Sequence, residues 1–471
     1  MSIETKQSQV NAKHAPELIR GLNMWHATSI VAGTIIGSGI FLVPAEMMQA
    51  VGSAALVYLA WVVGGLLSFF GALTYAELGA VRPFAGGEYV YVRDAYGPLP
   101  GFLYGWTWFL IAKPASIASV TAALVRVLMT FPTFAFLSQA FFAWQVTSSR
   151  VLTVTYGHLV AIAATVLITA LNYIGVRRAG NFQFAFTVLK VAMILTVAFV
   201  AFTSSTGSWS NFGTTFSGAK GGIAGFMAAL VAALWAYDGW NDLNMVSEEI
   251  ERPERTIPIA LIAGVALVAV LYIGMNAGIQ RALPATAIAN AAVPAAAASE
   301  AALGHVGIFL VSIGMIFSML ATLNGTVMSG GRVPFAVARD GYLFKALAEV
   351  HPIFHTPSLA LVIQALVAIL LIILGGAFRE LFSLAIFAEW LFYMIAASTI
   401  FVFRRREPDS IRPYRTAGYP VVPALFIGTA AVLLYYTFMS NLRNSVGGLV
   451  VIFLGIPVYL AFSRRKAKTT S

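Results

Sequence analysis

Long apolar runs restrict the possible folds of this chain more than any other feature of its sequence. The hydrocarbon core of a bilayer is about 30 Å thick, so a helix that crosses it needs about 20 apolar residues. Strands of a membrane barrel are about ten residues long and alternate in polarity, whereas these runs are longer and continuously apolar. The runs therefore predict an all-α membrane protein with twelve transmembrane helices, at 26–48, 53–80, 99–128, 154–173, 182–203, 221–246, 257–280, 304–331, 358–376, 380–403, 420–440 and 444–463.

The composition leaves little room for a separate soluble domain. Charged residues make up 10% of the 471 residues, whereas a soluble domain has about 25%. The longest segments between runs on the predicted outer side are 129–153, 204–220 and 281–303. The last of these is rich in alanine and is expected to carry a short helix.

The positive charges predict the orientation in the membrane. If both termini are cytoplasmic, most of the 29 Lys and Arg residues fall in cytoplasmic segments, as Arg404, Arg405 and Arg406 do, and this bias is typical of inner loops. We therefore expect cytoplasmic tails at 1–25 and 464–471, in the inner (plasma) membrane of the cell. Because the basic residues lie in clusters between apolar runs, we expect the lipid bilayer as partner and no nucleic acid.

The residue types that carry enzyme chemistry are scarce. The chain has no Cys and only six His, so neither a disulfide nor a thiolate metal site can form. No paired carboxylates or nucleophile–base combination recur at one depth of the predicted spans. We therefore expect neither an enzyme nor a cofactor or metal site.

Two of the runs are interrupted at matching places, the first at 33–39 and the sixth at 235–241. Glycine costs about 1 kcal/mol inside a helix, so the three glycines at 33–39 favour local unwinding. Unwound backbone in a bilayer is tolerated only where it faces protein or a wet cavity. Such matched interruptions indicate the binding site of a transporter, although small residues can also form a close helix-packing face.

An unwound first helix offers groups for both ends of an amino acid. The helix that restarts after Gly37 and Ser38 presents free amides and a positive dipole end, which would hold a carboxylate. The carbonyls of Ile35, Trp235 and Asp238 lose their helical donors and would accept from an ammonium. A zwitterion with both groups on one carbon fits this arrangement.

Five motifs in order carry a resemblance to a known family. The chain resembles the APC superfamily of amino-acid transporters, and within it the prokaryotic L-type (LAT) exchangers. The motifs are GTIIGSGIF at 33–41, GGEYVYVRDAYGP at 86–98, AYDGWNDLNMVSEEIERPERTIP at 236–258, RVPFAVARDGYLF at 332–344 and GIPVYL at 455–460.

The resemblance implies a fold and a function. The fold would be of the LeuT type, with inverted repeats at 26–203 and 221–403 and two additional C-terminal helices at 420–463. The function would be sodium-independent antiport of neutral L-amino acids by alternating access. A proton-coupled uptake permease stays open as an alternative, as does a broad exchanger of neutral and cationic amino acids.

The resemblance also assigns roles to individual residues. The substrate carboxylate would meet Ser38 and Gly39, Trp235 would close over the substrate, and Asn241 and Trp390 would line the pocket. Many large-neutral members have glycine where this chain has Asp238, and the residue here is similar to the branch that also accepts cationic amino acids. Asp238 could instead cap unwound backbone. Without cysteine, no disulfide-linked heavy chain can attach.

Ionisable residues inside predicted spans include Lys190, Lys113 and Glu389, and a charge there costs about 3 kcal/mol or more. Lys190 could reach the membrane surface with its long side chain. By resemblance, it would instead replace the cation of sodium-coupled relatives and tie the fifth helix to the unwound first helix. A lysine that loses its proton on desolvation could instead couple transport to protons. Lys113, which precedes Pro114, and Glu389 could form an ion pair.

Overall fold

The computed structural model describes residues 16–147, 150–374, 378–440 and 442–470. The first half of the chain forms α2 (Met24–Ile35), α3 (Gly39–Val51), α4 (Ala54–Val81), α5 (Glu88–Tyr96), α6 (Pro98–Thr107), the π-helical turn η1 (Trp108–Ala112), α7 (Lys113–Leu128), η2 (Pro132–Ser138), β1 (Ala140–Thr147), β2 (Arg150–Thr155), α8 (Tyr156–Tyr173), α9 (Val176–Thr203) and η3 (Trp209–Gly213).

The second half consists of helices joined by loops. It forms α10 (Gly222–Ala236), α11 (Asp242–Met245), η4 (Ser247–Glu249), α12 (Pro253–Ala282), α13 (Ala285–Asn290), α14 (Pro294–Leu303), α15 (His305–Gly330), α16 (Arg332–Arg339), η5 (Lys345–Ala348), α17 (Ser358–Leu374), α18 (Phe378–Arg406), α19 (Val421–Ser440), α20 (Leu442–Phe453) and α21 (Gly455–Thr470).

Ten helical segments of the described chain are long and apolar enough to cross a membrane, which confirms a helical membrane protein. Two further apolar helices, α10 and α17, are shorter. Helix α10 is short for a physical reason, since the predicted interruption ends it at Ala236 and the chain resumes a helix only at Asp242. The first run divides likewise between α2 and α3.

The segment between α7 and α8 departs from the all-α prediction. It holds the short helix η2 and an antiparallel hairpin of β1 and β2. Aromatic and β-branched side chains such as Phe142, Trp144 and Val151 favour strands, and their side chains are exposed. The segment 281–303 forms α13 and α14, which confirms the predicted short helix there.

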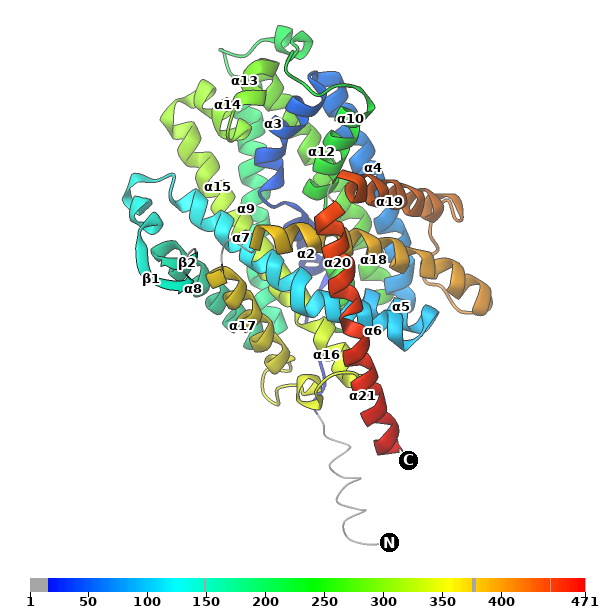
Figure 1. Cartoon of the computed structure of the whole chain (residues 1–471). Helices are drawn as coiled ribbons and strands as arrows, with labels where there is room; N and C mark the ends of the chain where they lie inside the picture. Colours follow the sequence, from blue (N-terminus) through cyan, green and yellow to red (C-terminus); the bar gives the residue numbers. More distant parts are fainter. Residues whose placement is uncertain (1–15, 148–149, 375–377, 441, 471) are drawn as a thin grey trace, which may run out of the picture.

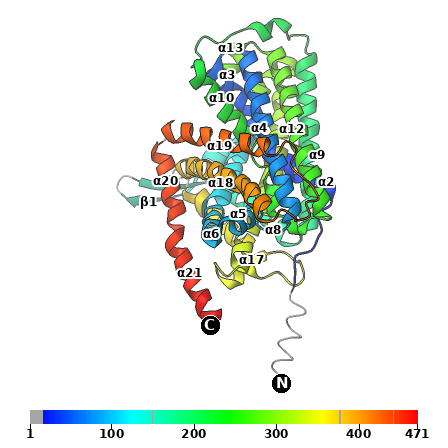
Figure 2. The ribbon, with the colours of Figure 1, turned by 90° about the vertical axis from the view of Figure 1, so that its right-hand side faces the viewer.

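The two ends of the described chain lie at the same end of the bundle, which we call the terminal end (Figures 1 and 2). Helices α13 and α14 lie at the opposite end, which we call the distal end (Figure 1). Helices α2 and α9 of the first half each pack against α12 and α15 of the second half, so the two halves of the sequence share one core.

Ion pairs tie the loops of the terminal end together. The guanidinium of Arg332 donates two hydrogen bonds to Glu249, at 2.7 and 2.9 Å, and both side chains are 0% exposed. Arg339 makes a similar double contact with Glu248, at 2.8 and 2.9 Å, nearer the surface. These pairs join η4, the segment after α11, to α16. They hold together two parts of the chain that are far apart in the sequence.

Replacing Arg332 by alanine should destabilise the protein strongly, because Glu249 would stay buried without a partner. Breaking a buried pair in this way costs about 3–5 kcal/mol. Arg339→Ala is the matched control, since its side chain is 40% exposed and exposed pairs contribute about 1 kcal/mol or less. Thermal unfolding in detergent, followed by tryptophan fluorescence, measures both. Equal shifts would contradict the structural role of the buried pair.

Candidate functional site

The two helix interruptions lie against each other inside the bundle. A Cβ atom on Gly39 would lie 3.0 Å from Cα of Ala236, so a side chain there would crowd this close approach of α3 to α10. The hydroxyl of Thr34 is 2.8 Å from the carbonyl oxygen of Gly239. Gly239 has a φ of 105°, a conformation that residues with a side chain rarely adopt. The glycines of both interruptions therefore serve close packing and backbone shape.

The start of α3 presents free backbone donors. Among the hydrogen bonds of the described residues, none has the amide of Ser38 or Gly39 as its donor. The first amides of a helix have no partner within the helix, and its dipole places positive potential there. Gly37, Ser38 and Gly39 all line the same cavity. This helix start can therefore bind a carboxylate, as the sequence predicts.

The carbonyls beside the interruptions have partners but keep acceptor capacity. The Ile35 carbonyl accepts from the amide of Gly37 at 2.7 Å, and the Trp235 carbonyl accepts from the amide of Asp238 at 3.2 Å. The hydroxyl of Tyr272 is 3.1 Å from the Ile35 carbonyl and 3.0 Å from that of Ala236. Sequence reasoning missed Tyr272, although a tyrosine within the apolar run 257–280 was a visible signal.

Lys190 binds the C-terminal end of α2. Its side chain is 0% exposed, so it does not extend to a membrane surface. Its ammonium donates to the carbonyls of Gly33 at 2.7 Å and Ile36 at 2.6 Å, and lies 3.3 Å from that of Ser318. Three N–H donors therefore face three carbonyls, two of which belong to the interrupted helix. Lys190 thus joins α9 to the interruption in α2, in the geometry that the resemblance implies.

A cavity of about 130 Å³ lies where the interruptions meet. It brings together most of the predicted site residues. Those that line it are Ile35, Gly37, Ser38, Gly39, Trp235, Asp238, Lys113 and Glu389. Further lining residues that sequence reasoning did not name include Ser116, Ser119, Asp242, Thr322, Thr326 and Tyr393.

Two predicted pocket residues lie elsewhere. Trp390 lines a neighbouring cavity of about 360 Å³, which shares Trp235 with the first cavity. Successive residues of a helix point about 100° apart, so Glu389 and Trp390 face different cavities. Asn241 is 1% exposed, and its amide nitrogen donates to Oε1 of Glu88 at 2.6 Å. The structure places Asn241 beside Glu88 and not among the cavity-lining residues.

The ionisable groups pair differently from the sequence prediction. Lys113 forms its ion pair with Asp242, so the predicted pair with Glu389 is wrong. Asp242 also accepts a hydrogen bond from the hydroxyl of Ser329 at 2.9 Å. The hydroxyl of Tyr393 donates to Oδ1 of Asp238 at 3.0 Å. Within the described ranges, no three His, Asp or Glu side chains converge as they would around a metal.

A π-helical turn places Lys113 at this site. The turn η1 ends at Ala112, immediately before Lys113 and Pro114. Proline lacks an amide N–H and so removes one bond of a regular α-helix, and π-turns in helices are frequent at functional sites. The wide turn thus gives this helix an irregular segment beside the two interruptions.

Known proteins resemble this chain over nearly its whole length. Residues 22–462 match the family described as amino acid permease. The serine/threonine exchanger SteT of Bacillus subtilis (strain 168) is 31% identical over 455 residues, which cover 96% of this chain and 98% of SteT. The human cystine/glutamate transporter is 31% identical over 457 residues, 97% of this chain and 86% of the relative. The b(0,+)-type amino acid transporter 1 of Mus musculus is 29% identical over 447 residues, 93% of this chain and 88% of the relative.

The chain belongs to the amino acid permease family. This permease is therefore a multi-pass membrane protein, and the predicted resemblance to the APC superfamily and its LAT-type exchangers is confirmed. The named relatives are exchangers and transporters, which fits the expectation that the permease is not an enzyme.

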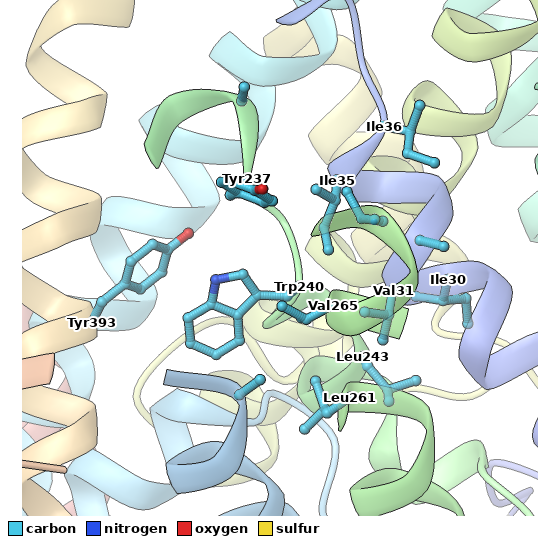
Figure 3. Packing of buried hydrophobic residues seen from close by; sticks show 14 of the residues in the cluster. Ile30, Val31, Ile35, Ile36, Tyr237, Trp240, Leu243, Leu261, Val265 and Tyr393 are labelled. Atoms are coloured by element: carbon cyan, nitrogen blue, oxygen red, sulfur yellow. The ribbon is translucent and has the colours of Figure 1, made fainter. Parts of the chain in front are cut away.

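Aromatic side chains pack beside the cavity of the permease. Trp240, which is 2% exposed, lies beside Tyr393 with ring centres 6.0 Å apart (Figure 3). On another side its ring meets Tyr75 edge to face, with centres 4.8 Å apart. Figure 3 shows hydrophobic residues of the interrupted helix, among them Ile35 and Val31, in the same cluster. This packing fixes Trp240, which lies within the second interruption.

Glu88 is a buried carboxyl close to this packing. It begins α5, outside the candidate membrane spans. Its Oε2 atom is buried without a partner among the described residues. Burial, with a smaller contribution from the charge of Asp242, raises the pKa of Glu88 to about 7, although the hydrogen bond from Asn241 opposes the rise. Glu88 therefore changes charge near neutral pH at a position that contacts the second interruption.

Replacing Gly39 by alanine should separate the two interrupted helices. The new methyl group would lie 3.0 Å from both Cα and Cβ of Ala236, and overpacking of this kind costs about 1–3 kcal/mol. Gly37→Ala is the matched control, because the nearest atoms to a Cβ there are 3.9 Å away. Melting temperatures in detergent should fall for Gly39→Ala and stay near the wild-type value for Gly37→Ala. The opposite order would contradict the packing described.

Replacing Glu88 by glutamine should stabilise the permease more at pH 8 than at pH 5. The folded-state pKa is raised from about 4.5 to about 7. The stability that this carboxyl contributes is present below pH 4.5 and is lost as the pH rises to about 7. Glutamine imitates the protonated form at every pH. The difference in melting temperature between variant and wild type should therefore grow between pH 5 and pH 8.

Glu248→Gln is the control for this experiment. Burial raises the pKa of Glu248, but the hydrogen bonds from Arg339 and the Ala85 amide and the charges of Arg339 and Arg20 together outweigh burial, and the net pKa is lowered. Its glutamine variant should therefore be less stable than wild type at pH 8. The interpretation of Glu88 fails if both variants shift in the same direction at pH 8.

Proposed function

We propose that this permease is a sodium-independent antiporter of neutral L-amino acids that works by alternating access. One observation carries the proposal: the free amides of Ser38 and Gly39 and the carbonyls of the two interruptions line one cavity inside a helical bundle. The substrate carboxylate would bind the amides, and its ammonium would bind the carbonyls of Ile35, Trp235 and Asp238. Both groups sit on one carbon of an amino acid, which matches two helix ends in contact.

Lys190 supports sodium independence. Its ammonium already donates hydrogen bonds to the carbonyls of Gly33 and Ile36. Carbonyl oxygens are ligands of the kind that a hard cation needs. A sodium ion at this place would meet both an occupied ligand set and a positive charge. The lysine would thus supply permanently the cation that sodium-coupled relatives must bind.

The proposed fold places this site between two related halves. Inverted repeats at 26–203 and 221–403 would put the two interruptions at corresponding positions, with residues 420–463 as two additional helices. Counting α10–α11 and α17 as spans gives twelve, and with cytoplasmic termini the terminal end of the bundle faces the cytoplasm. The cavity lining along α7 runs from Lys113 through Ser119 to Ala123, toward the C-terminal end of α7, which leads into the predicted outer segment 129–153. This supports access from the outer side in the present conformation.

Two alternatives have observations in their favour. Asp238 lines the cavity and accepts a hydrogen bond from Tyr393, so it could face a cationic substrate side chain in a broad exchanger. Lys190 is fully buried, and burial disfavours the charged form of a lysine, which would allow proton coupling. Since the chain has no cysteine, each alternative works without a disulfide-linked heavy chain.

Counterflow in proteoliposomes tests the proposal. Vesicles loaded with one unlabelled amino acid are offered labelled alanine, serine, leucine, phenylalanine or arginine without sodium. We expect uptake into loaded vesicles and little uptake into empty ones, unchanged when sodium is added.

Other outcomes identify the alternatives. Uptake into empty vesicles that an inward proton gradient drives would replace the antiporter with a proton-coupled permease. A requirement for sodium would contradict the role assigned to Lys190. If folded protein transports no member of the panel, the function as an amino-acid transporter is refuted.

A further inference from the structure

The hairpin of β1 and β2 has one strongly apolar face. In an antiparallel pair, residues that lie directly opposite each other share a face of the sheet. Phe142 lies opposite Val154, and Trp144 lies opposite Leu152. These four side chains form one face, which we call the apolar face. The other face is mixed in character and holds Ala143, Gln145, Val151 and Thr153.

The rest of the chain covers only part of the apolar face. Phe142 is 55% exposed and Trp144 is 62% exposed, whereas Leu152 and Val154 are half-buried. Arg150 is the one ionisable residue in the sequence 139–155. A hairpin of this composition in water would expose an apolar patch beside open strand edges, and both features promote aggregation. The apolar face therefore needs a partner that covers it.

Helix α8 determines where the hairpin lies relative to the membrane. The 18 residues of α8 form a candidate span, and a helix of this length measures about 27 Å, close to the hydrocarbon thickness of about 30 Å. No linker separates the two elements, because β2 ends at Thr155 and α8 begins at Tyr156. Thr155 also caps α8 by accepting a hydrogen bond from the amide of His158 at 3.3 Å. The hairpin therefore starts at a membrane surface, and it projects sideways from the bundle (Figure 2).

Aromatic rings continue from the hairpin onto the ends of the spans. Phe141 and Phe136 contact Tyr156 at the start of α8, with ring centres 5.6 and 5.9 Å apart. Phe131, which follows α7, contacts Phe309 near the start of α15, with ring centres 5.6 Å apart. Belts of aromatic side chains mark the two surfaces of the bilayer around membrane proteins. The apolar face is thus continuous with the surface that the spans present to lipid.

A second copy of the chain explains the apolar face less well than lipid does. The two exposed rings, Phe142 and Trp144, can each bury about 150–250 Å². Their sum is well below the buried area of about 1,000 Å² that a specific protein interface needs. Lipid has no such minimum, because the bilayer already surrounds the spans on which the hairpin is mounted.

We infer that the hairpin is a membrane-interface anchor, which lies on the bilayer surface with Phe142 and Trp144 inserted between the lipid headgroups. The mixed face is then turned toward water. An indole suits this place, because its ring is apolar while its N–H can bond a headgroup or water. The hairpin joins α8 to α7, which carries Lys113 and other lining residues of the substrate cavity. The anchor would hold this end of α7 at a constant depth, whichever substrate is carried.

Spin labels on single cysteines test the anchor. The natural chain has no Cys, so each introduced cysteine is the only site that reacts. Phe142→Cys and Trp144→Cys place labels on the apolar face, and Ala143→Cys and Gln145→Cys place labels on the mixed face. All four side chains are exposed, so the fold should tolerate the labels. Leu167→Cys on α8, where the side chain is 69% exposed, serves as the reference for a label in hydrocarbon.

Collision rates in proteoliposomes give the depth of each label. Electron paramagnetic resonance measures collisions with oxygen, which concentrates in lipid, and with a nickel chelate, which stays in water. We expect the ratio of oxygen to nickel collisions to alternate along β1, because successive side chains of a strand point to opposite faces. It should be high at positions 142 and 144, low at 143 and 145, and highest at 167.

Two results would overturn the anchor. Low ratios at all four hairpin positions would show that the hairpin lies free in water. Exclusion of both reagents from positions 142 and 144, together with broadening from spin–spin contact, would show that a second copy covers the apolar face.

Tryptophan fluorescence of unlabelled protein covers the case in which a cysteine variant does not fold. The chain has nine Trp, so the emission that Trp144 contributes is obtained by subtracting the spectrum of Trp144→Phe, which keeps an aromatic ring on the apolar face. We expect lipids brominated close to the headgroup to quench this difference signal, and iodide in the water to quench it little. The reverse order of quenching would overturn the anchor.

Discussion

Backbone polar groups inside a bilayer need partners, and this requirement governs the structure around the two interruptions. Where α2 stops at Ile35, the last carbonyls lose their helical donors, and lipid supplies none. Lys190 of α9 supplies the missing donors, because its ammonium donates hydrogen bonds to the carbonyls of Gly33 and Ile36. The desolvation of a lysine is costly, so the contact holds only while both helices stay in place. The interruption and the buried charge therefore depend on each other.

The same requirement leaves groups free for a ligand. At the start of α3, the amides of Ser38 and Gly39 have no donor role among the described hydrogen bonds, and the cavity lies in front of them. Close packing of Gly39 on Ala236 keeps the second interruption beside the first. The site is thus built mainly from backbone, while side chains such as Asp238 and Glu389 set the charge of its remaining walls. Backbone recognition would serve every amino acid, and the walls would select among them.

The sequence predicts the helices well and their contacts less well. A span needs a continuous apolar run, so the run 257–280 already marks most of α12, and the cost of glycine marks both interruptions. The pairing of Lys113 could not be predicted, because the interruption places Asp242 at the start of α11, where a continuous helix would not. Trp390 was misplaced for a related reason, since a step of one residue on α18 turns the side chain toward another cavity. The hairpin of β1 and β2 lies almost wholly in the segment 129–153 between predicted spans, and a search for long apolar runs does not identify strands.

The hydroxyl of Tyr272 has one hydrogen atom and two carbonyl neighbours. It lies within hydrogen-bond distance of Ile35 on the first interrupted helix and of Ala236 on the second, yet it can donate to only one of them at a time. Without a substrate, the carbonyls of Ile35 and Ala236 therefore compete for one hydroxyl proton. An ammonium group brings three donors, so a substrate ends this competition and lets both helix ends be satisfied together. Substrate binding and the alignment of the two helix ends would then occur together.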